Sequence, residues 1–167
     1  LALFRKLGDL GLLGLTVPES YGGAGQDAVS ATIVHEELSA SDPGFCLAYL
    51  AHSMLFVNNL AVNGNEDQKK RVLPGVSNGQ KIGCMAMSEP AVGTDVLGLE
   101  STAVADANGY VTNGRKMWIT NGCIDDVGTP ADYVWLYART GTQNGKPQLS
   151  TFLIEKGTPG YEVGQKI

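Results

Sequence analysis

The feature that most constrains the fold is a change of pattern near residue 80. Before it, apolar residues recur at the spacing of an α-helix. After it, β-branched and aromatic residues alternate with polar ones, and Gly and Asn-Gly pairs separate the runs. The 167 residues are enough for two small domains. The sequence therefore predicts an α+β protein, with a helical domain over residues 1–80 and a β-domain over residues 81–167.

Four helices are expected before residue 80. The first starts at the N-terminus, the second runs from a cap at Asp27 to about Ala40, and an apolar third helix ends near Asn63. The residues expected on the inner faces of the first two helices are Leu3, Phe4, Leu7, Leu10, Val29, Ile33, Val34 and Leu38. His35 lies beside two glutamates and is expected to be solvated. His52 lies within the apolar helix and is more typical of a hydrogen-bonded core residue than of a ligand or base.

The fourth helix explains the only basic run in the chain. Asn65 can cap this helix, Glu66 and Asp67 lie in its first turn, and Pro74 is expected to end it. The basic run 69–71 is then expected in the last turn, where positive charge suits the helix dipole. This interpretation needs no ligand for the basic residues.

The second part of the chain is expected to form short strands. They cover residues 82–88, 100–107, 110–119, 132–139, 150–155 and 161–166. Asn108-Gly109 is typical of a hairpin turn, and Asn121-Gly122 predicts a further turn or bulge. Short strands with tight turns favour an antiparallel barrel or sandwich. Aromatic residues that share one face of the fourth expected strand, and are expected in the core or an interface, are Tyr133, Trp135 and Tyr137.

Composition and charge argue against several classes of function. The net charge of −5 comes from scattered residues, whereas nucleic-acid binding needs a clustered basic surface. Three widely spaced cysteines indicate neither a disulfide framework nor a metal site. Cys46 and Cys84 are expected to be small core residues in a reducing compartment. Polar residues interrupt the apolar run 45–62, which favours a buried helix over a membrane span.

The segment 85–98 is the first with chemical character. A strand is expected to end at Ser88, and Pro90, Gly93 and Gly98 follow among hydroxyls and two acids. Such a strand exit can present backbone N–H groups and hydroxyls to a planar polar ring or a phosphate. A plain structural turn accounts for the same residues, and physical reasoning alone leaves both interpretations open.

The segment 116–122 is the second segment with chemical character. Trp118 stands two residues before Thr120, and on a strand the two side chains would share a face. A flat apolar ring beside a hydroxyl can cover an aromatic cofactor and hydrogen-bond its edge. The alternative is a core Trp next to a Thr at a strand end, which is the commoner explanation for an isolated pair.

Together, the two segments resemble the signature motifs of the acyl-CoA dehydrogenase family. Residues 88–95 resemble its Ser/Thr-Glu motif with Gly-Ser/Thr-Asp four residues after the Glu, and residues 118–122 resemble its Trp-Ile-Thr-Asn-Gly stretch. Further matches are found at residues 14–23, 51–53, 63–69 and 152–160. The resemblance covers essentially all 167 residues and is nearest to the isovaleryl-CoA dehydrogenase, or short branched-chain, branch.

The resemblance implies a fold and a cofactor. The fold is a helical domain followed by an antiparallel β-barrel, with the family's C-terminal helical domain absent from this chain. The cofactor is FAD. Residues expected to bind it are Met85, Ala86, Met87, Ser88, Gly93, Thr94, Trp118, Ile119 and Thr120. By analogy, Ser88 hydrogen-bonds the N1/C2=O side of the flavin and Thr120 lies near N5. Trp118 covers one side of the ring, and Thr94 faces both the FAD pyrophosphate and the pantetheine arm of the substrate.

The implied reaction is α,β-dehydrogenation of an acyl-CoA with a short or branched chain. A base removes the α-proton, the β-hydride passes to flavin N5, and the electrons then pass to electron-transfer flavoprotein. The family's base is a glutamate expected beyond Ile167, so this chain is expected to be a fragment that is inactive alone. Glu89 and Asp95 are expected to shape their loop. The resemblance also implies a homotetramer, in the mitochondrial matrix of a eukaryote or the cytoplasm of a bacterium.

Two alternatives share these motifs. One is a flavoprotein oxidase of the same fold, of the acyl-CoA oxidase or nitroalkane oxidase type. The other is a non-catalytic interaction module, which Val92 favours because the family usually has a smaller residue or Asn there. The segment 123–131 is longer than the usual link after the Trp motif and is expected to form a surface loop near a subunit contact.

Overall fold

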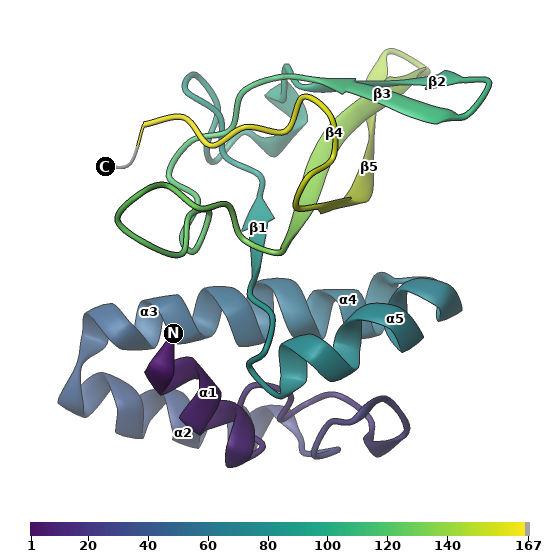
Figure 1. Ribbon diagram of the computed structural model, residues 1–167. Coiled ribbons are helices and arrows are strands. Elements are labelled where there is room, and N and C mark those ends of the chain that lie inside the picture. The colour runs from purple at the N-terminus through teal and green to yellow at the C-terminus, as the bar shows by residue number, and fades with distance from the viewer. Residues whose placement is uncertain (166–167) are drawn as a thin grey trace.

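The computed structural model describes residues 1–165, and it places a layer of helices against a mixed β-sheet (Figure 1). The helices are α1 (Ala2–Asp9), α2 (Ala28–Ser41), α3 (Pro43–Leu50), α4 (Asn59–Asn63) and α5 (Glu66–Ser77), with a π-helical segment η2 (Ala51–Asn58) and two 3-10 turns, η1 (Glu19–Tyr21) and η3 (Val96–Gly98). The strands are β1 (Gly83–Ala86), β2 (Thr102–Asp106), β3 (Gly109–Asn113), β4 (Tyr133–Gln143) and β5 (Lys146–Glu155). The chain leaves the helical layer at the end of α5, and β1 carries it into the sheet. The expected α+β class is confirmed.

The expected caps begin two of the helices. The Asp27 carboxylate accepts a hydrogen bond of 2.9 Å from the Ser30 backbone N–H at the start of α2. Asn65 and Gln68 form a reciprocal capping box at the start of α5. These bonds satisfy N–H groups that have no partner inside their own helix, so local sequence alone fixes both helix starts.

The core-facing side of α2 differs from the expected one. Val29 is 65% exposed and Ile33 is 53% exposed, so the prediction that they face inward is wrong. Val34 and Leu38 pack inward as predicted, and Ala31 joins them; these positions lie three and seven residues after Ala31 and therefore on one side of the helix. The apolar residues of α2 are distributed around the helix, and only contacts with α1 and α3 select which of them are buried.

Two further predictions on helix faces need correction. In α1, Phe4 and Leu7 are buried as expected, whereas Leu3 and the residue that caps the helix, Leu10, are more than half exposed. His35 was expected in solvent but is half-buried, with Nδ1 donating to the Ala31 carbonyl at 2.6 Å and its ring 4.9 Å from that of Tyr49.

Helix α5 continues one turn past the point where it was expected to end. Pro74 lies inside the helix, which runs to Ser77. The basic residues 69–71 therefore lie in the middle of the helix and not in its last turn. Arg71 forms ion pairs with Asp67, one turn earlier, and with Glu155 of β5. These pairs account for part of the basic run without a ligand.

α3, η2 and α4 form one continuous helix over residues 43–63. By length and composition this helix could cross a membrane, but 44% of its most apolar window is buried inside the protein. Tyr49, Phe56 and Leu60 are almost completely buried in the core beside α5 and the sheet. Core packing therefore explains the apolar run.

β4 is the central strand of the sheet. β1 and β2 each run parallel to β4, whereas β2–β3 and β4–β5 are antiparallel hairpins. The expectation of antiparallel strands therefore holds for only two of the four pairings. Long connections separate β1 and β2 from β4, and such connections permit parallel pairing. Among residues 1–165 no pairing closes the sheet into a barrel.

Several strand limits differ from the expected ones. The strand expected over 110–119 ends at Asn113, and residues 161–165 of the last expected strand are not in a strand, while residue 166 lies outside the described residues. β4 and β5 are longer than expected because Asn144-Gly145, with φ of 53° and 74°, joins them in a tight hairpin. The hairpin expected at Asn108-Gly109 is confirmed, with Ala107 and Asn108 as its turn residues.

The aromatic stripe of β4 packs against the helices as expected. Trp135 is 2% exposed in the main core cluster, with Tyr133 and Tyr137 packed around it. The Tyr137 hydroxyl also accepts a hydrogen bond of 3.0 Å from the Asn59 amide of α4. Cys46 and Cys84 are buried with free thiols, as predicted.

A buried histidine joins the long helix to the first strand. His52 is fully buried; its Nδ1 accepts from the Gly83 N–H at 3.1 Å, and its Nε2–H donates to the Val76 carbonyl at 3.0 Å. Burial lowers the His52 pKa, so the ring stays neutral and keeps this donor–acceptor pattern. The prediction of a hydrogen-bonded core histidine is confirmed.

Gly83→Ala should destabilise the protein by about 2 kcal/mol, because a Cβ at this position would overlap the buried ring of Phe56. Gly141→Ala is the matched control, since nothing lies within 4 Å of a Cβ built there. We expect the control to change the free energy of unfolding by less than about 0.5 kcal/mol. Urea unfolding of the two variants measures this, and equal stabilities would contradict the packing described here.

Candidate functional site

A pocket of about 160 Å³ forms where the exit of β1, a later turn and the long helix meet. Its lining residues are Ala51, Leu55, Met85, Met87, Ser88, Trp118, Ile119 and Thr120. The two chemically interesting segments of the sequence therefore converge on one space, although about thirty residues separate them along the chain.

Alternation along β1 and the residue after it decides which side chains face this pocket. Met85 and Met87 line it, while Ala86 between them is 4% exposed and packs on the opposite side with Cys84. Ser88 follows where the strand has ended and brings a hydroxyl to the same side. The wall thus combines two flexible thioether side chains with one polar group.

Hydrogen bonds hold the walls of the pocket together. The Met117 N–H donates to the Ser88 carbonyl at 2.9 Å, which joins the strand exit to the turn. The Asn121 amide donates to the Ala48 carbonyl at 2.8 Å, which joins the turn to the long helix. The pocket is therefore fixed by contacts between segments distant in sequence.

Trp118 is not on a strand, contrary to the prediction. Its backbone is in the left-handed region, with φ of 56°, and its side chain is 64% exposed. A bulky residue in this region costs about 1 kcal/mol or more and persists only where surrounding contacts impose it. Trp118 and Thr120 nevertheless line the same pocket, because the turn, and not strand alternation, directs them there.

The loop after Ser88 leads away from the pocket. Glu89 and Val92 form a tight turn, with the Glu89 N–H donating to the Val92 carbonyl at 2.8 Å. Gly93 and Thr94 are exposed and do not line the pocket, so their assignment to the cofactor and substrate remains a prediction. Val92 is half-buried and lines neither of the two cavities described here.

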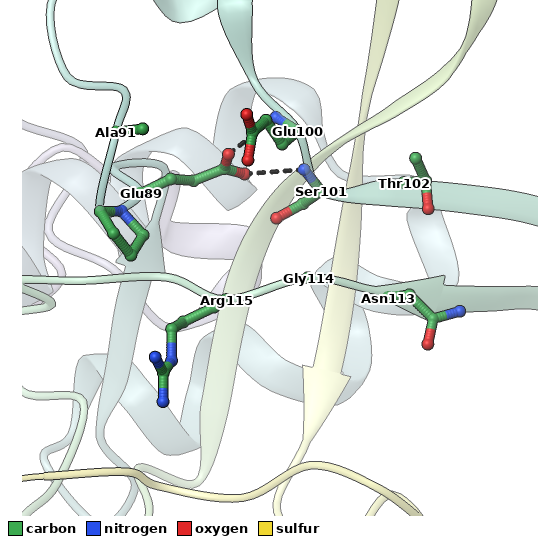
Figure 2. Close-up of a pocket in the computed structure, with 9 residues that line it drawn as sticks. Glu89, Ala91, Glu100, Ser101, Thr102, Asn113, Gly114 and Arg115 are labelled. Atoms are coloured by element: carbon green, nitrogen blue, oxygen red, sulfur yellow. Dashed lines mark hydrogen bonds between the residues drawn. The ribbon is translucent and has the colours of Figure 1, made fainter.

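Glu89 is a buried carboxylate that joins three segments. It accepts hydrogen bonds from the backbone N–H groups of Glu100 at 2.7 Å and Ser101 at 3.0 Å (Figure 2) and from Lys116 Nζ at 2.8 Å. Burial alone would raise the Glu89 pKa, but the hydrogen bonds from Lys116, Ser101 and Glu100 outweigh it and lower the pKa to about 2. The expectation that Glu89 shapes its loop is confirmed.

A larger cavity of about 490 Å³ lies beside Glu89 (Figure 2). It is lined by Glu89, Pro90, Ala91, Glu100, Ser101, Thr102, Asn113, Gly114 and Arg115. Within residues 1–165 its lining carries charges of both signs, from Glu89, Glu100 and Arg115, and no aromatic side chain, which suits solvent better than a flat ring. The smaller pocket, with apolar walls and two hydroxyls, has the composition of a ligand site.

The smaller pocket fits the edge of the flavin ring that the sequence resemblance implies. Its apolar walls can cover a planar ring, and the hydroxyls of Ser88 and Thr120 supply polar contacts at its edge. The Ser88 N–H has no hydrogen-bond partner among residues 1–165, so one further donor is available there. The exposed indole of Trp118 offers a flat surface of the required kind.

Comparison with known proteins shows the family of the chain. Residues 1–80 match the family model of the acyl-CoA dehydrogenase N-terminal domain, and residues 84–167 match that of the acyl-CoA dehydrogenase middle domain. The chain belongs to the acyl-CoA dehydrogenase family. Both motif segments lie within the middle-domain match.

Named relatives lie within the same family. The mitochondrial isovaleryl-CoA dehydrogenase of Arabidopsis thaliana is 39% identical over 99% of this chain, which spans 39% of that protein's length. The acyl-CoA dehydrogenase of Bacillus anthracis, solved in complex with FAD, superposes with a TM-score of 0.81 and 39% identity over 95% of this chain and 26% of its own. A chain in a structure of the electron transferring flavoprotein of Acidaminococcus fermentans has a TM-score of 0.86 at 34% identity, over 98% of this chain and 42% of its own.

Sequence reasoning missed several residues that line or support this pocket. Ala51 and Leu55 line the pocket from the π-helical segment, which no sequence pattern announced. Lys116 and Asn121 hold the turn in place. Lys116 stands two residues before the motif Trp. A search for oppositely charged residues beside the two motifs could therefore have paired it with Glu89.

The Glu89 carboxylate should make stability depend on pH. Its folded pKa of about 2 lies below its ordinary value of 4.5, so its contribution is complete above pH 4.5 and is lost as the pH falls toward 2. At neutral pH the contribution is about 3 kcal/mol. Urea unfolding should therefore show Glu89→Gln less stable at pH 7, with a difference that shrinks on acidification. The exposed Glu100→Gln is the control, and a difference independent of pH would refute this account.

The left-handed backbone at Trp118 should reverse the order of stability that Gly and Ala variants usually show. At a position in the left-handed region, Gly relieves about 1 kcal/mol of strain, which outweighs its greater freedom in the unfolded chain. We therefore expect Trp118→Gly to be at least as stable as Trp118→Ala. At Val127, which is 89% exposed and has no positive φ, Gly should be less stable than Ala. Thermal unfolding of the four variants tests this, and the same order at both sites would contradict it.

Proposed function

We propose that this chain forms the flavin-facing part of an FAD-dependent enzyme that dehydrogenates acyl-CoA thioesters between the α- and β-carbons. The observation that carries the proposal is the convergence of Ser88, Trp118 and Thr120 on one apolar pocket. Those residues belong to the two motifs that the family shares, and their side chains offer a flat surface and two hydroxyls in one place. FAD complexes are known among the structural neighbours of this chain.

The residues of the chain would hold the cofactor in distinct ways. Bound FAD supplies the acceptor for the substrate hydride. The Ser88 hydroxyl and N–H would donate at the pyrimidine edge, where negative charge collects on reduction, and would favour that charge. Thr120 would hydrogen-bond near N5, and Trp118 would cover one side of the ring. Met85 and Met87 would exclude water from the opposite border.

The base that removes the α-proton is proposed to lie outside the pocket residues described here. The lining within residues 1–165 includes no side chain that titrates near neutral pH. Glu89 is unsuitable because it is buried, already accepts three hydrogen bonds and has a pKa of about 2. We propose a glutamate from a C-terminal helical domain, as the family resemblance implies.

The proposed substrate is an acyl-CoA with a short or branched chain. The likeness to isovaleryl-CoA dehydrogenase supports this choice, together with the small side chain of Ala51 at the helical wall. Thr94 lies on an exposed loop from which it would reach the pantetheine arm. The proposed partners are electron-transfer flavoprotein and further copies of the chain in a tetramer. The proposed location is the mitochondrial matrix in a eukaryote or the cytoplasm in a bacterium.

The experiment uses the longest natural protein that contains this chain. Purified protein incubated with FAD should show the visible absorption bands of bound flavin, and anaerobic isovaleryl-CoA should bleach them faster than a long straight-chain acyl-CoA does. Turnover should then reduce an artificial electron acceptor without consuming oxygen.

Three outcomes would count against the proposal. No flavin bands after incubation would indicate a non-catalytic module, although Val92, the residue that favoured that alternative, lines neither cavity. Rapid oxygen consumption would indicate an oxidase. Faster bleaching by the long straight chain would overturn the substrate assignment alone.

A further inference from the structure

A buried ion pair lies directly behind the pocket. The side chains of Glu89 and Lys116 are 4% and 10% exposed, and their charged atoms are 2.8 Å apart. Neither residue lines the smaller pocket. Glu89 directly follows Ser88, and Lys116 stands two residues before Trp118, both of which line it. Removing one partner of a buried pair is costly, but replacing the whole pair with apolar residues is often neutral or stabilising, so stability does not explain why a pair stands at this place.

Lys116 also controls the direction of one peptide group. Its Nζ donates to the Met87 carbonyl at 3.0 Å as well as to Glu89. Because a trans peptide is planar, the N–H of Ser88 must point away from the carbonyl that Lys116 holds. That N–H has no partner among the described residues, and Ser88 lines the pocket.

The next peptide group is held in the same way. The Ser88 carbonyl accepts from the Met117 N–H at 2.9 Å, and the Glu89 N–H donates to Val92. The backbone on both sides of Ser88 is thus fixed by residues outside the pocket. Glu89 in turn is anchored by the two backbone N–H groups just before β2 (Figure 2), so it holds the Lys116 ammonium in a fixed position.

We propose that Glu89 and Lys116 are positioning residues, which orient the Met87–Ser88 peptide so that the Ser88 N–H and hydroxyl both face the cofactor edge. The inference rests on the function proposed above. Their effect is exerted through the orientation of donors where negative charge develops on reduction, and not through contact with the reacting atoms. Loss of the pair should therefore make the flavin harder to reduce.

The sign of the change in reduction potential separates this role from a simple charge effect. Glu89→Gln removes a negative charge close to the site, which by electrostatics alone would make the flavin potential more positive. Misdirected donors would make it more negative. Glu155→Gln is the matched control, because Glu155 forms an ion pair with Arg71 that is about half exposed.

The experiment compares the reduction potentials of the FAD-loaded full-length protein and its variants, together with their FAD dissociation constants. We expect Glu89→Gln to shift the potential to a more negative value and to raise the FAD dissociation constant about tenfold, the loss of roughly one hydrogen bond. The control should leave both quantities unchanged. Where Glu89→Gln does not fold, Glu89→Asp decides the question, since it keeps the charge, retracts the carboxylate from Lys116 and should shift the potential in the same direction.

The outcomes distinguish the two levels of the proposal. A folded, FAD-loaded variant with an unchanged or more positive potential would overturn the positioning role while leaving the proposed function intact. A natural protein that takes up no FAD would overturn the proposed function, and the positioning role with it.

Discussion

The contact between the first strand and the long helix is the constraint on which the rest of the structure depends. Gly83 has no side chain, so β1 can pass directly over the ring of Phe56. His52 fixes the position of the strand by accepting a hydrogen bond from the Gly83 N–H. Once the strand starts at that point, alternation brings Met85, and Met87 just after the strand, to the helical wall at Ala51. The neutral state of the histidine is part of this constraint, because a charged ring would be costly in the core.

A second set of contacts completes the site at the far end of the strand. The strained backbone at Trp118 is held between Lys116, which is anchored on the strand exit, and Asn121, which is anchored on the helix. Each anchor uses a charged or amide side chain to satisfy a backbone carbonyl. The free energy of these bonds offsets the cost of the left-handed turn, and the indole is left exposed toward the pocket.

The sequence was informative where the deciding contacts are local. The caps at Asp27 and Asn65 depend on bonds that reach three residues ahead, so their residue types alone placed the helix starts. The inner face of α2 was predicted only in part, because apolar residues surround that helix and only its neighbours bury Ala31 in preference to Val29. The conformation of Trp118 was equally hidden, since its causes lie far away in the chain. Convergence of the two motifs was expected from family resemblance and not from any spacing rule.

The irregularity in β4 separates two registers of its pairing with β5. The register shift lies between Arg139 and Gly141, so residues 133–136, which pair with β1, lie on one side of it and the turn at Asn144-Gly145 lies on the other. A dye attached at that turn would therefore sit beyond the irregularity, away from the part of β4 that pairs with β1. The Asn144-Gly145 turn is therefore the natural place to attach a reporter for following assembly, while the part of β4 that pairs with β1 must keep its length.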